Sequence, residues 1–453
     1  MIKRIFTLCL ISSAAALLAF EPSVDLSHGK LKVSDDSRYL VFEDGTPFFW
    51  LGDTAWELFH RTTREEAEFY LKNRAEKGFT VIQAVVLAEL DGLNTGNAYG
   101  DRPLIGDDPA RPNEAYFAHV DYIVRRARDL GIFIGMLPTW GDKFNRKWGV
   151  GPEVFTPENA YTYGLFLGER YKEEPVIWIL GGDRTCDNNE DLEITRAMAR
   201  GLGDGDGGAH LKTYHPQGGH SSSEWFHNDA WLDLNMFQSG HGEINNANYR
   251  MAEHNYNLKP VKPVLDGEPN YEDHPINWRP QNGWFDEFDS RRAGYWSMLS
   301  GACGHTYGNH NIWQMWLPGR TPVSAARTPW IQSIDYPGAF QAGIMRRFFE
   351  AYPWQSLVPA PSWLRSGPNT GGREIRVAAA ANGTLVFAYS PYGTSFTLDL
   401  SAVKGEKIKT HWFNPRNGTT VTVGTAEKTE LMAFDPPADE KRGNDWVLVL
   451  KTM

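Results

Sequence analysis

The chain has 453 residues, with 45 Lys and Arg against 56 Asp and Glu, which gives a formal net charge of −11 at pH 7. This acidic balance argues against a nucleic-acid or anionic-membrane partner, because either partner would need a basic face. Three cysteines are too few for a disulfide framework. Aromatic residues make up 13% of the chain, a content that fits either a flat-ligand site, such as a carbohydrate site, or a large aromatic core.

Residues 1–20 have the pattern of a secretory signal peptide. Lys3 and Arg4 precede an apolar run, and small residues follow up to Ala19, near which we expect cleavage. The alternative is an N-terminal anchor helix, but the run is short for a membrane span. We therefore expect a protein that is secreted, periplasmic or held at the cell surface, with no membrane contact once the signal is removed.

The remaining chain divides into two predicted domains. Residues 25–355 alternate short apolar runs with amphipathic stretches, whereas residues 360–453 show short alternating strands separated by NG, PYG and PRNG turns. The second pattern is typical of an all-β sandwich. The boundary is expected near 357–363, where prolines follow a predicted helix over 339–352.

The first domain repeats a unit of one strand followed by one helix. Helical spacing is clearest over 63–78 and 113–131, and both segments end in Gly before the next strand. The predicted strands cover 48–53, 80–86, 132–138, 176–183, 211–216, 234–241, 262–269 and 304–310. Eight such units predict an α/β fold of the (β/α)8 TIM-barrel type. A doubly wound sheet is the alternative, but the Gly-rich phosphate loop usual after its first strand is missing.

Two strand ends carry a carboxylate next to glycine. VIWILGGD places Asp183 at the end of the fourth strand, and KPVLDGEP places Glu268 at the end of the seventh. Carboxylates on these strands of a barrel face each other across its mouth, as an acid/base and a nucleophile do in many retaining glycosidases. Asp266 competes with Glu268 for the second role, and a structural ion pair with Arg184 is an alternative for Asp183.

Other residues at the strand ends suit a sugar site. Aromatic rings can pack on the C–H faces of sugars, and amides, imidazoles and carboxylates can hydrogen-bond hydroxyl groups. We predict no metal site, because the histidines lack HxH and HxxxH spacing, and no cofactor. The predicted substrate-binding residues are Asp53, Trp56, Gln83, Trp140, His215, Gln238, His241, Tyr271, Tyr307 and Trp313.

Together, WLGDTAWELF, VIWILGGD, DGEPNYE and GHTYGNHNIW resemble the apiosidase-like glycoside hydrolases of family 140. The C-terminal LVPAPSW and WFNPRNGT resemble the small β-sandwich that follows the barrel in that family, a module named for collagen binding. The resemblance covers residues 25–453. It implies a secreted bacterial barrel enzyme that cleaves next to apiose in the pectin rhamnogalacturonan II, with Asp183 and Glu268 as the catalytic pair.

Rival functions are weaker. A serine hydrolase would need a GxSxG elbow and a zinc peptidase would need HExxH, and neither motif occurs. The alternative from another class is a barrel that binds glycan without cutting it. In either case we expect an oligosaccharide or polysaccharide partner.

Overall fold

The computed structural model describes residues 22–453, so the predicted signal peptide lies outside the described residues. Within this range, the first domain contains a six-stranded parallel sheet of order β11-β4-β5-β6-β7-β8 and a two-stranded parallel sheet of β9 and β10. These strands are β4 (Trp50–Thr54), β5 (Val81–Leu87), β6 (Phe133–Thr139), β7 (Val176–Gly181), β8 (Lys212–His215), β9 (Asn235–Phe237), β10 (Val264–Asp266) and β11 (Gly304–Tyr307). Each one overlaps a predicted strand.

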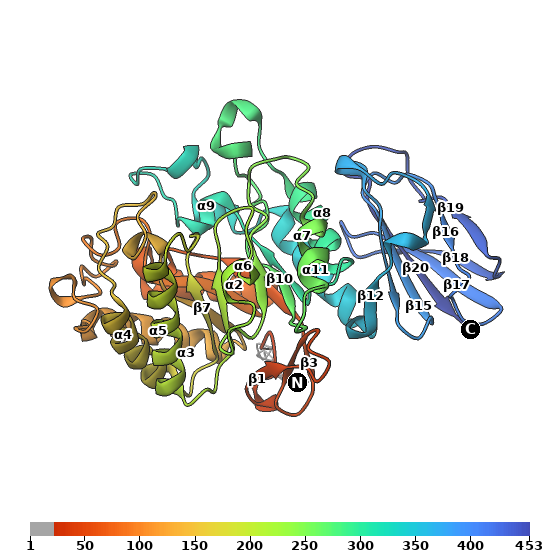
Figure 1. Cartoon of the computed structure of the whole chain (residues 1–453). Coiled ribbons are helices and arrows are strands. Elements are labelled where there is room, and N and C mark those ends of the chain that lie inside the picture. The colour runs from red at the N-terminus through yellow and green to blue at the C-terminus, as the bar shows by residue number, and fades with distance from the viewer. Residues whose placement is uncertain (1–21) are drawn as a thin grey trace, which may run out of the picture.

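The two parallel sheets meet at both edges. Between β8 and β9, the backbone N–H of Asp233 donates to the carbonyl of Lys212 over 2.9 Å, and between β10 and β11 the N–H of Cys303 donates to Val264 over 2.9 Å. The eight strands therefore follow one another in chain order in a curled, TIM-like arrangement, with helices outside it (Figure 1).

Helices alternate with these strands along the chain. Thr63, the residue before α2, forms a capping box, in which its side chain accepts from the N–H of Glu66 while the Glu66 side chain accepts from the N–H of Thr63. The helices are α1 (Leu58–Arg61), α2 (Arg64–Glu76), α3 (Glu114–Asp129), α4 (Pro157–Tyr171), α5 (Asn189–Asp206), α6 (Ser223–Phe226), α7 (Asn248–Tyr256), α8 (Glu287–Met298), α9 (His310–Trp313), α10 (Trp330–Ser333) and α11 (Pro337–Glu350). The predicted helices over 63–78, 113–131 and 339–352 correspond to α2, α3 and α11.

Strand alternation sorts side chains between the inside of the curled sheet and the helices. On β5, Val81 and Val85 join one apolar cluster with Ile177 and Ile179 of β7, while Ile82 and Val86 join a second cluster with the surrounding helices. This period of two decides which side chains can reach the mouth of the fold.

A small antiparallel sheet lies at the amino ends of the parallel strands. It comprises β1 (Leu31–Val33), β2 (Leu40–Phe42) and β3 (Pro47–Phe48). Phe42 and Phe48 pack on Phe133, the first residue of β6, with ring centroids 6.2 and 5.3 Å apart. These rings therefore cover the amino end of β6.

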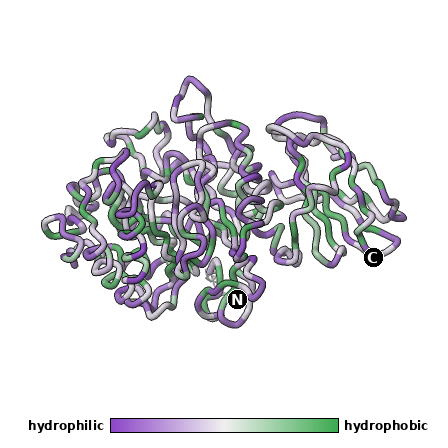
Figure 2. Tube along the Cα trace, viewed as in Figure 1, coloured by the Kyte–Doolittle hydropathy of each residue, from purple (hydrophilic) through white to green (hydrophobic). Residues whose placement is uncertain are grey.

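The C-terminal region is an antiparallel β-domain, as expected for a sandwich. One sheet has the order β12-β14-β15-β20-β17-β18 and the other has the order β13-β16-β19. Apolar residues concentrate in several of these strands (Figure 2). The strands are β12 (Leu357–Pro359), β13 (Leu364–Ser366), β14 (Arg376–Ala380), β15 (Leu385–Ser390), β16 (Phe396–Asp399), β17 (Lys407–Phe413), β18 (Thr420–Glu427), β19 (Leu431–Phe434) and β20 (Trp446–Thr452).

This β-domain shares a core with the helices of the first domain. Phe348 of α11 stacks on Phe413 of β17 with centroids 4.3 Å apart, and Tyr295 of α8 stacks on Tyr389 of β15 at 4.9 Å. Figure 1 shows α8 and α11 on the side that faces the C-terminal strands. Burial of these rings contributes to holding the two domains in a defined orientation. In the described part of the chain, no helix is long and apolar enough to cross a membrane.

Candidate active site

A cavity of about 840 Å³ lies at the carboxyl ends of the parallel strands. Its lining comes from segments that follow most of those strands, which is where active sites lie in TIM-barrel enzymes. Eight of the twelve predicted site residues line it: Trp56, Trp140, Asp183, Gln238, His241, Glu268, Tyr271 and Trp313.

Glycines after β7 allow Asp183 to reach the cavity. At Gly182 φ is +102°, and a Cβ there would lie 2.9 Å from the Cα of Trp140, so a side chain has no room. Asp183 itself has φ of +54°, a left-handed conformation that few residues other than glycine adopt, although aspartate and asparagine do so more often than most. The turn after the strand therefore aims the carboxyl group into the mouth of the fold, where it is about one-fifth exposed.

The surroundings of Asp183 favour its protonated form. Burial and then the nearby carboxylate of Glu268 raise the pKa of Asp183 to about 7. The indole N–H of Trp148, which donates to Oδ2 over 3.1 Å, acts in the opposite direction. A carboxylic acid of this kind can donate a proton near neutral pH.

The surroundings of Glu268 favour its ionised form. Burial by itself raises the pKa of this carboxyl group, but His215 and His241 outweigh burial and hold the pKa at about 2. Nε2 of His241 lies 2.9 Å from Oε1 of Glu268, and Nε2 of His215 lies 3.1 Å from Oε2. Of these two carboxyl groups, Asp183 therefore favours the acid form and Glu268 the carboxylate form.

His215 contacts both acidic residues from below the cavity. The backbone N–H of Asp183 donates to its Nδ1 over 3.2 Å, so this nitrogen carries no proton. A ring proton of His215 is then on Nε2, which lies next to Glu268. His215 does not line the cavity, but it contacts the backbone of Asp183 and the carboxylate of Glu268, which both do.

Besides His215, three predicted substrate-binding residues do not line the cavity. Asp53 and Tyr307 alternate outward from their strands, where Asp53 pairs with Arg74 of α2 at 2.5 Å and the Tyr307 hydroxyl donates to Glu272 over 2.5 Å. Gln83 points inward but lies deeper, and its side-chain N–H donates to the carbonyl of Gly267 over 3.0 Å. We do not include these residues among the proposed sugar contacts.

Asp266, the alternative nucleophile, also points away from the cavity. Its side chain accepts from the hydroxyl of Ser239 at 2.7 Å and from the amide of Asn248 at 3.1 Å. Strand pairing ends at Asp266, so Glu268 does not follow the strand alternation that would place both carboxylates on one side.

Other cavity residues were outside the predicted set. Trp148 lies in the same loop as Trp140 and contacts Asp183, and Glu89, after β5, is a third carboxyl group at the site. Burial, followed by the charge of Asp183, raises the pKa of Glu89 well above its usual range. A tryptophan in a glycine-rich loop was the available signal for Trp148. Further lining residues are Gln217, Glu243, Asn246 and Trp278.

Family comparison agrees with this geometry. Residues 34–356 match the family model described as "Apiosidase-like, catalytic domain". The chain belongs to the apiosidase-like family. Residues 358–451 match a second model, "Putative collagen-binding domain of a collagenase".

Solved structures give the same class. A protein titled "Glycoside hydrolase" is 33% identical with a TM-score of 0.87, over 95% of this chain and 99% of its own. A glycoside hydrolase family 5 protein from Bacteroides vulgatus ATCC 8482 is 31% identical with a TM-score of 0.87, over 95% of each chain. The search of curated proteins gave no match. The apiosidase-like chain is thus an enzyme of the glycoside hydrolase class.

Proposed function

We propose that this chain is a secreted, retaining glycoside hydrolase whose eight parallel strands form a closed (β/α)8 barrel. Asp183 acts as the acid/base and Glu268 as the nucleophile. The observation that carries the proposal is the opposite effect of the surroundings on these two carboxyl groups in one cavity. Environments that push two pKa values apart assign one group as acid and the other as base or nucleophile.

In the first step, an oxygen of Glu268 attacks the anomeric carbon of the bound sugar. The glycosidic C–O bond breaks, and Asp183 transfers its proton to the leaving oxygen. In the second step, the Asp183 carboxylate removes a proton from a water molecule whose oxygen attacks the same carbon. The bond to Glu268 then breaks, and both carboxyl groups return to their starting states.

The proposed substrate is a plant cell-wall polysaccharide, in particular the apiose-containing side chains of rhamnogalacturonan II. Its support is the family to which the chain belongs. Rings of Trp56, Trp140, Trp278 and Trp313 line the cavity and offer apolar surface for sugar rings.

Release of sugar from a panel of plant cell-wall glycans, including rhamnogalacturonan II fragments, tests this function. The wild type is compared with Asp183→Asn and Glu268→Gln. We expect turnover by the wild type and a loss of about 10³-fold or more in each variant, the scale for removal of a group that acts in the transition state. Equal glycan binding by all three proteins without turnover would instead indicate a glycan-binding role.

A further inference from the structure

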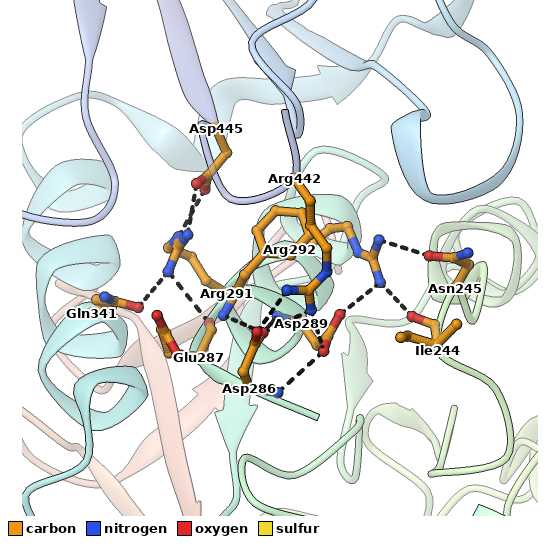
Figure 3. Close-up of polar contacts among 11 residues, drawn as sticks. Ile244, Asn245, Asp286, Glu287, Asp289, Arg291, Arg292, Gln341, Arg442 and Asp445 are labelled. Atoms are coloured by element: carbon orange, nitrogen blue, oxygen red, sulfur yellow. Dashed lines mark hydrogen bonds and ion pairs between the residues drawn. The ribbon is translucent and has the colours of Figure 1, made fainter. Parts of the chain in front are cut away.

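The C-terminal β-domain contacts α8 through three arginines, which Figure 3 shows together. Arg291 pairs with Asp445 at 2.6 Å, and Arg442 pairs with Asp286 at 2.6 Å. Both pairs link the two domains. Arg292 differs from Arg291 and Arg442, because it also contacts a loop that lines the cavity. We propose that Arg292 is a positioning residue through which the C-terminal β-domain sets the shape of the catalytic cavity.

Arg292 joins three parts of the chain. Its Nη1 donates to the carbonyl of Gly372 in the β-domain over 3.2 Å and to Oδ1 of Asn245 over 2.9 Å. Its Nη2 donates to the carbonyl of Ile244 over 2.5 Å (Figure 3). The guanidinium group is buried, and Asp289 balances its charge at 3.1 Å. A buried, paired arginine with several acceptors holds those acceptors in fixed positions.

The contacted loop, residues 241–246, follows β9 and has two sides. His241, Glu243 and Asn246 line the cavity, whereas Ile244 and Asn245 are the residues that Arg292 contacts. Residues 242–245 are exposed, so little packing holds the middle of the loop. The hydrogen bonds from Arg292 are therefore expected to contribute much of its order.

Gly372 provides the link from the β-domain. A Cβ at this position would lie 2.4 Å from Oδ1 of Asn245 and 2.8 Å from Nη1 of Arg292. The backbone of Gly372 is outside the left-handed region, so alanine adds a steric clash without backbone strain. A single methyl group in the β-domain should thus displace the Asn245 side chain and the Arg292 guanidinium group, and so disturb the hydrogen bonds that hold this loop of the other domain.

The consequence for the reaction rests on the proposed function. His241, at the start of the loop, holds Oε1 of Glu268. Displacement of the loop should weaken this hydrogen bond, and the pKa of Glu268 should then rise, because one of the groups that favour its ionised form is lost. As the pH is lowered, activity that depends on the ionised form of Glu268 would be lost at a higher pH than in the wild type.

The test compares full-length wild type with Gly372→Ala and Arg292→Lys, a second variant that keeps the charge but not the planar fork. Arg373→Gln is the matched control. It neighbours Gly372, but its side chain pairs with Glu440 and does not contact the loop. Hydrogen–deuterium exchange of peptides covering 239–246 reports on the loop without any substrate. The pH profile of kcat/KM reports on Glu268.

We expect exchange in 239–246 to be about threefold faster or more in both variants, with the control at the wild-type rate. We also expect the acidic limb of the pH profile to move upward in both. Unchanged exchange would overturn the proposal, and so would faster exchange with an unmoved acidic limb. If the wild type cleaves no glycan, the proposed function fails, and the exchange rates still decide whether the β-domain orders the loop.

Discussion

Nε2 of His241 lies 2.9 Å from Oε1 of Glu268 in a site where both side chains are almost fully buried. A hydrogen bond to a charged group contributes ~1.5–3 kcal/mol, and its loss here acts directly on the ionised form of Glu268. The contact therefore accounts for part of the low pKa of a carboxyl group that burial alone would make a weaker acid.

His241→Phe removes this hydrogen bond and keeps an aromatic ring. We expect the pKa of Glu268 to rise from about 2, so that the acidic limb of the kcat/KM profile moves to higher pH. The hydrogen-bond free energy above corresponds to a fall of about 10- to 100-fold in kcat/KM. If the variant kept the acidic limb and the kcat/KM of the wild type, the contact would not act on Glu268.

Trp148→Phe should change the alkaline limb of the pH profile of kcat/KM. The indole N–H donates to Oδ2 of Asp183 and favours its ionised form, so removal of the N–H raises the pKa of Asp183 above about 7. The protonated acid then persists to higher pH, and the alkaline limb of kcat/KM moves upward. Trp278→Phe is the control, because Trp278 lines the cavity without a hydrogen bond to Asp183 among those found in residues 22–453. Movement of the alkaline limb to lower pH would contradict this account.

Asp53→Asn should affect stability more than catalysis. Asp53 is fully buried, accepts from the hydroxyl of Tyr70 at 2.5 Å and pairs with Arg74 at 2.5 Å. Breaking such a pair leaves a buried charge unpaired and costs ~3–5 kcal/mol of unfolding free energy.

Denaturant unfolding measures this cost. Glu427→Gln is the control, because its ion pair with Lys407 lies at the surface and contributes ~1 kcal/mol or less. At a temperature where the variant is folded, we expect KM close to that of the wild type. An unchanged unfolding free energy together with a raised KM would return Asp53 to the set of sugar contacts.

The repeat of strand and helix was predictable, because the spacing of apolar residues and the glycines at helix ends can be read from short stretches of sequence. Asp183 and Glu268 were also predictable as neighbours, since the carboxyl ends of parallel strands share one face. The side of the sheet to which the Asp53 and Tyr307 side chains point was not predictable, because it depends on the strand register. Nor was the contact between Arg292 and Gly372, which lie 80 residues apart and meet only when the two domains pack together.

The most direct test of the central claim uses Asp183→Ala and an aryl glycoside of the sugar that the wild type releases. An activated leaving group needs no proton, so Glu268 should still attack, but no base remains to activate water and the glycosyl-enzyme should accumulate. Rapid quenching and peptide mass spectrometry locate the bound sugar. The account predicts one sugar attached to Glu268. Rapid release of phenol with no adduct, or an adduct on another residue, would contradict it.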